Sequence, residues 1–348
     1  MRFYDLITQP SIGGYGPSGA LNGTGGVFRQ WSSFQGGSYD AQAQDIVFDI
    51  QIVPGHTPSG ASVISIHGVS IDDLIHTRNF QYSSLSLSVG MLGGMPLSVN
   101  QPSPGLLISA TVLGAFGNWQ GTEQTLDLLI NPSTATPEYP ANIVFSWGIG
   151  QTFASAITAA LKPAWPLSTI TVAVSPALTA IAAVPSLSVG YPILHKSSTA
   201  SGFAHFIHHL THAVIGPNYP GVSIYFIGSQ IIVTDHTVNV AAKPIIINFN
   251  DLVGQPTWLE PPTLTINTIM RADIQVGSYI QLPTSEIPGP GAVLTMPTKA
   301  GTVFANKLNF SGTFVVTSLR SVGQFRGTDA DDWLTVIQAV PLEAIGAF

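Results

Sequence analysis

The sequence predicts a mainly β fold with a small α/β insert, in which two β-barrel domains flank a middle α/β domain. The first observation is the frequency of turn residues. In 348 residues, 35 glycines and 26 prolines separate short runs rich in β-branched side chains, as is typical of all-β proteins. The second is that helical periodicity occurs in the middle of the chain. The third is a motif that occurs once in each outer part.

Each expected strand is a short apolar run that ends at glycine, proline or a polar cluster. In the first part of the chain they are Asp45–Val53, Ala61–Val69, Ser83–Gly90, Gly105–Phe116 and Thr125–Ile130. In the last part they are Lys243–Phe249, Pro262–Met270, Val276–Pro283, Ser311–Val322 and Trp333–Val340.

The middle of the chain predicts two helices and a hairpin. Gly150–Lys162 has apolar residues at helical spacing and should end at Pro163. Ser201–Gly216 predicts a second helix, and Gly221–Gly228 with Gln230–Asp235 predicts a β-hairpin. The expected domains are therefore residues 1–130, a first β-barrel; 131–242, the α/β domain; and 243–348, a second β-barrel.

One internal repeat supports two related outer domains. Phe116–Glu123 (FGNWQGTE) and Val322–Asp329 (VGQFRGTD) share glycine, amide, aromatic, glycine, threonine and acid in the same order, at an offset of 206 residues. Each follows a long predicted strand and precedes another. Chance similarity between two glycine turns is the alternative to duplication. The motif residues are Gly117, Trp119, Gly121, Gly323, Phe325 and Gly327.

Composition favours a subunit whose surface is covered by partners. Charged residues make up 8% of the chain and mean hydropathy is +0.34, against about 25% charged residues in an average protein. No apolar run is long and uninterrupted enough to predict a membrane span, since the best candidate, Ile170–Val189, contains two prolines. A net charge of −7 argues against tight binding of nucleic acid, and the absence of cysteine excludes disulfides.

Four histidines between His205 and His212 raise the question of a metal site. On a helical wheel they lie opposite an apolar arc of Phe203, Phe206, Ile207, Leu210, Ala213 and Val214. A histidine face that carries subunit contacts is the favoured interpretation. The alternative is a metal site with His205 and His209 as ligands, because i and i+4 imidazoles can share one metal.

We find no catalytic constellation in the sequence. There is no G-x-S-x-G motif and no phosphate-binding lysine loop, and the glycine-rich stretch Ser11–Gly26 predicts a loop. We therefore expect no enzyme activity and no cofactor.

Several stretches resemble the baseplate central hub proteins of contractile-tailed bacteriophages, the tail hub or late control protein D-like family. The most specific is Asp251–Pro283, with Gly254, Gln255, Pro256, Thr257, Trp258, Arg271, Asp273 and Gly277. Phe314–Ala339, Gly90–Ile130 and Phe145–Pro166 are also similar, in the right order. Ser321 and Gln324 depart from the histidine and the acid that the family often carries there.

The resemblance implies a homotrimer with two tube-like β-barrel domains per subunit, in the tail baseplate of a virion and made in the host cytoplasm. Its partners would be a trimeric tail spike and the first ring of the tail tube, with the tape-measure protein and baseplate wedge proteins as further candidates. DNA would meet the protein only in transit through its channel, whose wall should be acidic. Gly254, Gln255, Pro256, Trp258, Arg271 and Asp273 would serve structure or interfaces.

Two other functions remain open at this stage. One is a metal-dependent hydrolase, such as a cell-wall-degrading tail component, based on the His205–His212 helix. The other is a β-rich receptor or glycan binder, a class that usually displays exposed aromatic platforms.

Overall fold

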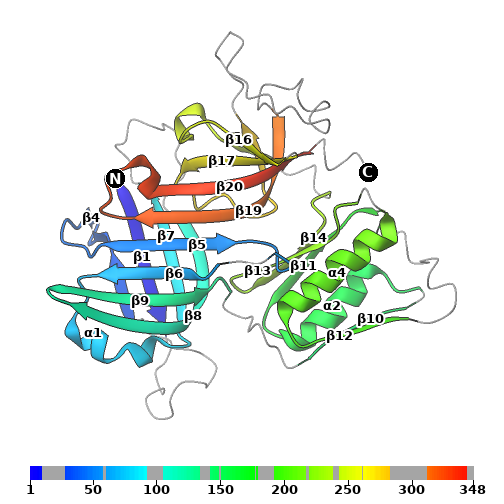
Figure 1. Cartoon of the computed structure of the whole chain (residues 1–348), viewed down its shortest axis with the longest axis horizontal. Helices are drawn as coiled ribbons and strands as arrows, with labels where there is room; N and C mark the ends of the chain where they lie inside the picture. The colour runs from blue at the N-terminus through cyan, green and yellow to red at the C-terminus, as the bar shows by residue number, and fades with distance from the viewer. Residues whose placement is uncertain are drawn as a thin grey trace, which may run out of the picture.

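In a computed structural model, the described residues form one large, mainly antiparallel sheet and a smaller helical part (Figure 1). The structure describes residues 1–9, 28–57, 60–91, 105–133, 142–148, 150–176, 178, 192–216, 219–237, 243–260, 262–282 and 312–342. The predicted loop Ser11–Gly26 lies outside these ranges. The mainly β class with a small helical insert is confirmed.

Among the described residues, the first part of the chain forms nine strands and two short helices. They are β1 Arg2–Gln9, β2 Arg29–Ser32, β3 Phe34–Gln35, β4 Ser38–Tyr39, β5 Ile46–Ile52, β6 Ser62–His67, α1 Ile71–Ile75, η1 Thr77–Phe80, β7 Ser84–Met91, β8 Gly105–Gln120 and β9 Glu123–Asn131. Burial alternates along β1, β5, β6, β7 and β9, as expected for strands with one face on a core.

The middle part contains the two predicted helices and the predicted hairpin. Its elements are β10 Ile143–Trp147, α2 Phe153–Ala164, β11 Thr169–Ala173, β12 Ile193–Ser197, α4 Ala200–Ile215, β13 Ser223–Ile227 and β14 Gln230–Thr234. The two helices and both small sheets pack around one core. Pro163 does not end α2 as expected but lies in its last turn; the backbone N–H of Trp165 still bonds to Leu161, which closes the helix beyond the proline.

The last part adds β15 Ile245–Ile246, η3 Phe249–Asp251, β16 Thr257–Glu260, β17 Thr263–Ile269, β18 Tyr279–Leu282, β19 Gly312–Gln324, η5 Ala330–Asp332 and β20 Trp333–Pro341. The strand expected over Lys243–Phe249 is wrong in extent. Only Ile245 and Ile246 pair, with β18. The chain then turns into η3, because Asp251 accepts hydrogen bonds from the backbone and side chain of Asn248.

The two outer parts of the chain have the same order of strands. In the first, the neighbours run β5-β6-β9-β8-β7-β1; in the last they run β16-β17-β20-β19-β18-β15. Corresponding strands also follow one another in the same order along the chain. All pairings within the two sets are antiparallel except β15–β18, which is parallel. This shared order agrees with a duplication, while the domain boundaries stay a prediction.

One pairing joins the two halves. Val47–Ile52 of β5 pairs with Leu319–Gln324 of β19, and we call this pairing the seam. It makes a single sheet of 13 described strands that includes both outer parts. Figure 1 shows β19 directly beside β5.

The seam packs closely at one glycine. A Cβ atom on Gly323 would lie 2.2 Å from Cζ of Phe48. Phe48 is buried and packs edge-on against Trp333, with ring centroids 5.3 Å apart, so its ring cannot move aside freely. Gly323 is therefore required for close packing across the seam.

We expect Gly323→Ala to lower the free energy of unfolding by about 2 kcal/mol, because an overpacked core must shift. Gly148→Ala is the matched control, since a Cβ there would meet Cβ of Pro192 at an ordinary 3.8 Å. Urea unfolding of both variants measures the difference. Equal midpoints for the two would contradict a tight seam.

Candidate functional site

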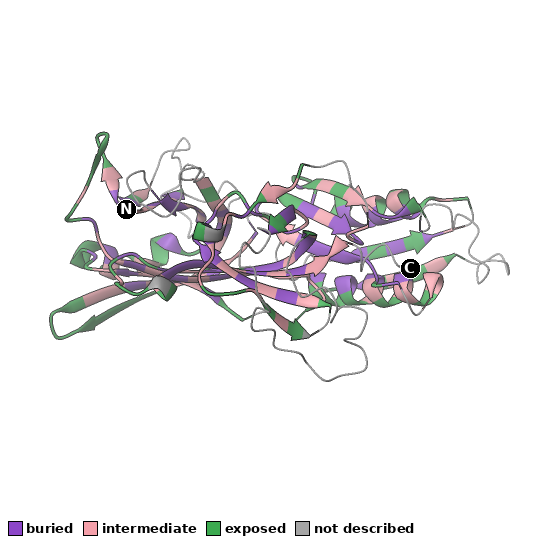
Figure 2. Cartoon of the chain, turned by 90° about the horizontal axis from the view of Figure 1, so that it is seen from above, coloured by how far each residue is buried: buried purple, intermediate pink, exposed green. Residues whose placement is uncertain are grey.

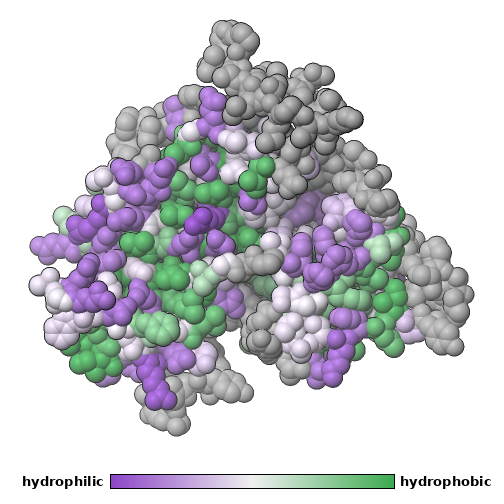
Figure 3. Space-filling view, viewed as in Figure 1, coloured by the Kyte–Doolittle hydropathy of each residue, from purple (hydrophilic) through white to green (hydrophobic). Residues whose placement is uncertain are grey.

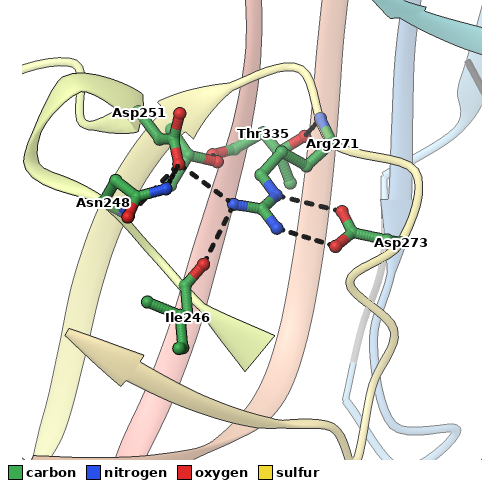
Figure 4. Close-up of polar contacts among 7 residues, drawn as sticks. Ile246, Asn248, Asp251, Arg271, Asp273 and Thr335 are labelled. Carbon is green, nitrogen blue, oxygen red and sulfur yellow. Dashed lines mark hydrogen bonds and ion pairs between the residues drawn. The ribbon is translucent and has the colours of Figure 1, made fainter. Parts of the chain in front are cut away.

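Arg271 forms the most elaborate buried polar cluster in the last part of the chain (Figure 4). It follows β17 and is 5% exposed. Its Nε and Nη2 donate to the two carboxylate oxygens of Asp273 at 3.0 and 2.7 Å, and its Nη1 lies 3.2 Å from Oδ2 of Asp251. This is the planar two-point geometry that makes arginine–carboxylate pairs specific.

The same cluster ties four elements together. The backbone N–H of Arg271 donates to Oγ1 of Thr335 on β20, and its Nη1 reaches the carbonyl of Ile246 on β15. Asp251, 1% exposed, belongs to η3. Oδ1 of Asp251 is buried without a hydrogen-bond partner in the described part of the chain. The guanidinium and the other oxygen of Asp251 are paired within the cluster, which acts as a structural clamp. The sequence indicated Arg271 and Asp273, but not Asp251, which is distant in the chain.

The other residues of the family-like stretch form the turn before an outer strand. Gly254 has a φ of +81°, which suits glycine. Gln255 is exposed, Pro256 is partly buried, and Trp258 packs on the core of the last part from β16. None of the four contacts the Arg271 cluster in a described hydrogen bond.

The motif residues lie where β8 and β19 end, but the two motifs do not superpose residue for residue. Gly121 (φ +62°) forms the β8–β9 turn and Trp119 is 62% exposed. Gly117 lies against Leu74 of α1. Phe325 is buried against Tyr4, and Gly327 lies against the side chain of Asp332 and accepts from Arg2.

The offset of 206 is therefore wrong for the strands. Both strands bulge, β8 between Val112 and Gly114 and β19 between Val316 and Ser318. When the two bulges are aligned, Val112 corresponds to Val316, which is a spacing of 204 residues in place of 206. A shift of two residues keeps every side chain on its own face, which is why the alternating pattern could not reveal it.

The histidine helix α4 has a mixed face. His205 and His209 are exposed, and their Nε2 atoms lie 3.1 Å apart. Ala213, expected on the apolar side, is exposed, and Thr211 is buried there instead because its hydroxyl accepts the N–H of Val222. Among the described residues, no three His, Cys, Asp or Glu side chains gather closely enough to hold a metal ion.

His208 faces inward and stacks on His56, from the loop after β5, with ring centroids 4.0 Å apart. Nδ1 of each ring is buried without a hydrogen-bond partner in the described part of the chain. Burial, and the charges that His208, His205, His209 and His236 would carry, lower the pKa of His56 to about 4; burial also lowers the pKa of His208. Both rings are therefore kept neutral where the middle part meets the first. No sequence pattern predicts this stack, because His56 stands alone in its loop.

No described helix is long and apolar enough to cross a membrane.

No protein-family model and no curated protein sequence matches the chain. Among solved structures, it is similar to the 43 kDa tail protein of prophage MuSo2 from Shewanella oneidensis, with a TM-score of 0.44, 11% identity and 99% of each chain covered. A tail protein from Neisseria meningitidis MC58 has a TM-score of 0.42 and 10% identity, over 97% of this chain and 96% of that one.

A third similar structure is the E. coli c3393 protein, described as a component of the type VI secretion system with structural similarity to the T4 bacteriophage tail proteins gp27 and gp5. Its TM-score is 0.44 and its identity 8%, over 86% of this chain and 73% of that one. Because all three TM-scores are below 0.5, the function proposed below rests on this chain's own sequence and strand order.

We expect Arg271→Ala to lower the free energy of unfolding by about 3 kcal/mol, because it leaves Asp251 as a buried unpaired charge. Arg320→Ala is the control. Arg320 forms a similar two-point pair with Asp49, but that pair is about half exposed and should contribute under about 1 kcal/mol. Chemical denaturation measures both, and equal losses would contradict the clamp.

Stability should depend on pH through His56. Its pKa is about 4 in the folded chain and about 6.5 when unfolded, so the unfolded chain binds the proton first. Stability is then complete above about pH 6.5 and falls as the pH drops toward 4. The loss should be on the order of 1 kcal/mol, discounted for partial exposure of the ring.

His56→Gln should remove most of this pH dependence, and the double variant with His208→Gln should flatten it further. Thermal or urea unfolding between pH 4 and 7.5 measures the slope. An unchanged slope in His56→Gln would show that the ring is not held neutral.

Proposed function

We propose that the protein is a structural subunit of a phage tail: a trimeric baseplate hub that adapts a three-fold tail spike to the six-fold tail tube. The observation that carries this proposal is the repeated strand order within one chain. Three copies with two similar halves each present six similar units. A ring of this kind can match a six-fold partner on one side and a three-fold partner on the other.

A polar sheet face supports a channel. In antiparallel pairs, opposed residues share a face. By this register, Asp5, Asp49 and Asp127 all lie on the face away from the core of the first part. Arg320 lies on the same face and is paired with Asp49. An acidic wall would let DNA and the tape-measure protein pass without sticking.

The apolar surface supports coverage by partners. Large hydrophobic side chains are exposed in all three parts. Figure 3 shows hydrophobic patches between hydrophilic ones on one face of the molecule. Examples are Ile75, Leu194 and Leu259, at 70%, 67% and 59% exposure. Together with 8% charged residues, these side chains favour burial in an assembly that includes the spike and the first tube ring.

In this role the protein acts through complementary interfaces and carries out no chemical step. The alternative of a metal-dependent hydrolase would need more than His205 and His209, because catalytic zinc sites use three protein ligands.

Light scattering of the purified chain should give a native mass of about 110 kDa, three times the subunit mass of 36.6 kDa, as expected for a closed ring of three. Electron microscopy of the same sample should show six similar lobes around a central hole. A mass of one subunit at every concentration, both alone and with the cognate spike protein, would contradict the proposal.

A further inference from the structure

One edge of β19 serves two partners in succession. Its residues Gly312–Val315 pair with β18, and Leu319–Gln324 pair with β5 across the seam. The change of partner occurs at the bulge between Val316 and Ser318.

β8 is built in the same way but has no second partner among the described strands. Its beginning pairs with β7, and it then bulges after Val112. The hydrogen bonds at the two bulges correspond. At the β8 bulge, the N–H of Tyr82 donates to the carbonyl of Val112 at 2.7 Å, and the N–H of Val112 donates to the carbonyl of Ser83 at 3.0 Å. At the β19 bulge, the N–H of Gly277 donates to the carbonyl of Val316 at 2.8 Å, and the N–H of Val316 donates to the carbonyl of Ser278 at 3.0 Å. Beyond its bulge, β8 pairs only with β9 among the described residues, although Gly117 also packs against Leu74 of α1 and Thr77 of η1. We call Ala115–Gln120 the free edge of β8.

Exposure follows from this difference. In β19, Leu319 and Ser321 beyond the bulge are buried by the seam. In β8, the corresponding Ala115 is half-buried and Gly117 is exposed. Trp119, which corresponds to the buried Gly323, is 62% exposed, and the hairpin tip stands out as exposed at the left of Figure 2. The free edge carries no charge and no proline. Natural proteins usually protect open strand edges with such residues, so this edge is suited to pairing.

The strand that would fit this edge is present at the other end of the sheet. β16 occupies the place in the last part that β5 occupies in the first. The buried pair Ile64↔Leu128 of the first part corresponds to the buried pair Ile266↔Ile337 of the last part. When these pairs are aligned, Val63 corresponds to Thr265. Their partners are Asp49 and Thr257. Counting two residues further along each strand sets Gln51 against Leu259, which is the extra residue of the bulge that β16 forms between Trp258 and Glu260. β16 pairs only with β17 among the described strands, and Leu259 is 59% exposed.

We propose that the free edge of β8 binds β16 of a second copy, antiparallel and in the register of the seam. In the seam, Arg320 lies opposite Gln51. In the contact between copies, Phe116 of one copy takes the place of Arg320, and Leu259 of the next copy takes the place of Gln51. This inference rests on the proposed ring and names the strands that would close it. Each copy offers one edge and receives another, and such head-to-tail contacts form rings when the rotation closes.

The geometry favours a disulfide test at this pair. The N–H of Phe325 donates to the carbonyl of Ile46. Because backbone groups alternate in direction along a strand, every second residue of β19 counted back from Phe325 bonds to β5. Arg320 is not one of these residues, so Arg320↔Gln51 is a non-hydrogen-bonded pair. Side chains approach most closely in such pairs, within the range of a disulfide. The chain has no native cysteine to interfere.

The double variant Phe116→Cys, Leu259→Cys should therefore oxidise to a covalent trimer on a non-reducing gel. We expect its formation to be at least about tenfold faster than any product of the control pair Phe116→Cys, Leu167→Cys, because only the first pair is held within bonding distance. Leu167 is 91% exposed in the middle part, so its thiol is accessible but should not be opposed to residue 116.

A second variant tests the edge itself. Ala115 corresponds to Leu319 and turns its N–H toward the free edge, so Ala115→Pro removes a donor there while β8 keeps its bonds to β9. The native mass should fall to that of one subunit, with an unchanged urea midpoint for subunit unfolding.

The outcomes separate the two proposals. A trimer by light scattering that gives no faster disulfide than the control pair and persists in Ala115→Pro overturns the strand pairing and leaves the hub standing. A rapid disulfide in dimers or open chains supports the strand pairing and contradicts the ring. A subunit that neither associates nor cross-links contradicts both.

Discussion

The fold depends on the backbone pairing between β5 and β19. It brings together residues 271 positions apart, as the Arg320–Asp49 pair shows. Around it, Arg2 donates to the carbonyls of Gln324 and Asp329, and the N–H of Arg326 donates to Asp45. Phe325 and Trp333 from the last part complete the core of the first part. The two halves therefore share packing as well as a sheet, and neither core is complete without the other.

The middle part is held between the halves by a few specific contacts. The N–H of Gly55 donates to Ile224, and the hydroxyl of Tyr225 donates to the carbonyl of Thr317 at the β19 bulge. His56 and His236 are both kept neutral by burial at these contacts, with pKa values lowered to about 4. Tyr225, Ile227 and Ile232 of the middle part also pack in the core of the last part. Because protonation of the neutral rings would weaken this junction, we expect it to loosen before the seam under acid stress.

Local pattern was enough to predict most strands and both helices, because one-sided burial imposes a period of two or 3.6 residues. It failed where distant groups decide the structure. Lys243–Phe249 has the composition of a strand, but η3 forms where Asp251 meets Asn248 and Arg271. The motif similarity suggested duplication but gave the wrong offset, since the bulges that fix the register leave no mark in composition. The seam, the His56–His208 stack and the open edge of β8 arise from long-range pairing, which a single sequence does not encode in its periodicity.

The long separation across the seam also bears on synthesis. β5 emerges from the ribosome some 270 residues before its partner, a delay of roughly 15–50 s at typical bacterial rates of translation. During that time its outer edge is an unpaired strand in a chain with few charges to discourage aggregation. The first half must therefore persist as an incomplete domain, with Phe48 uncovered. Efficient production should then depend on chaperones that shield strand edges, even though the finished subunit is a single continuous sheet.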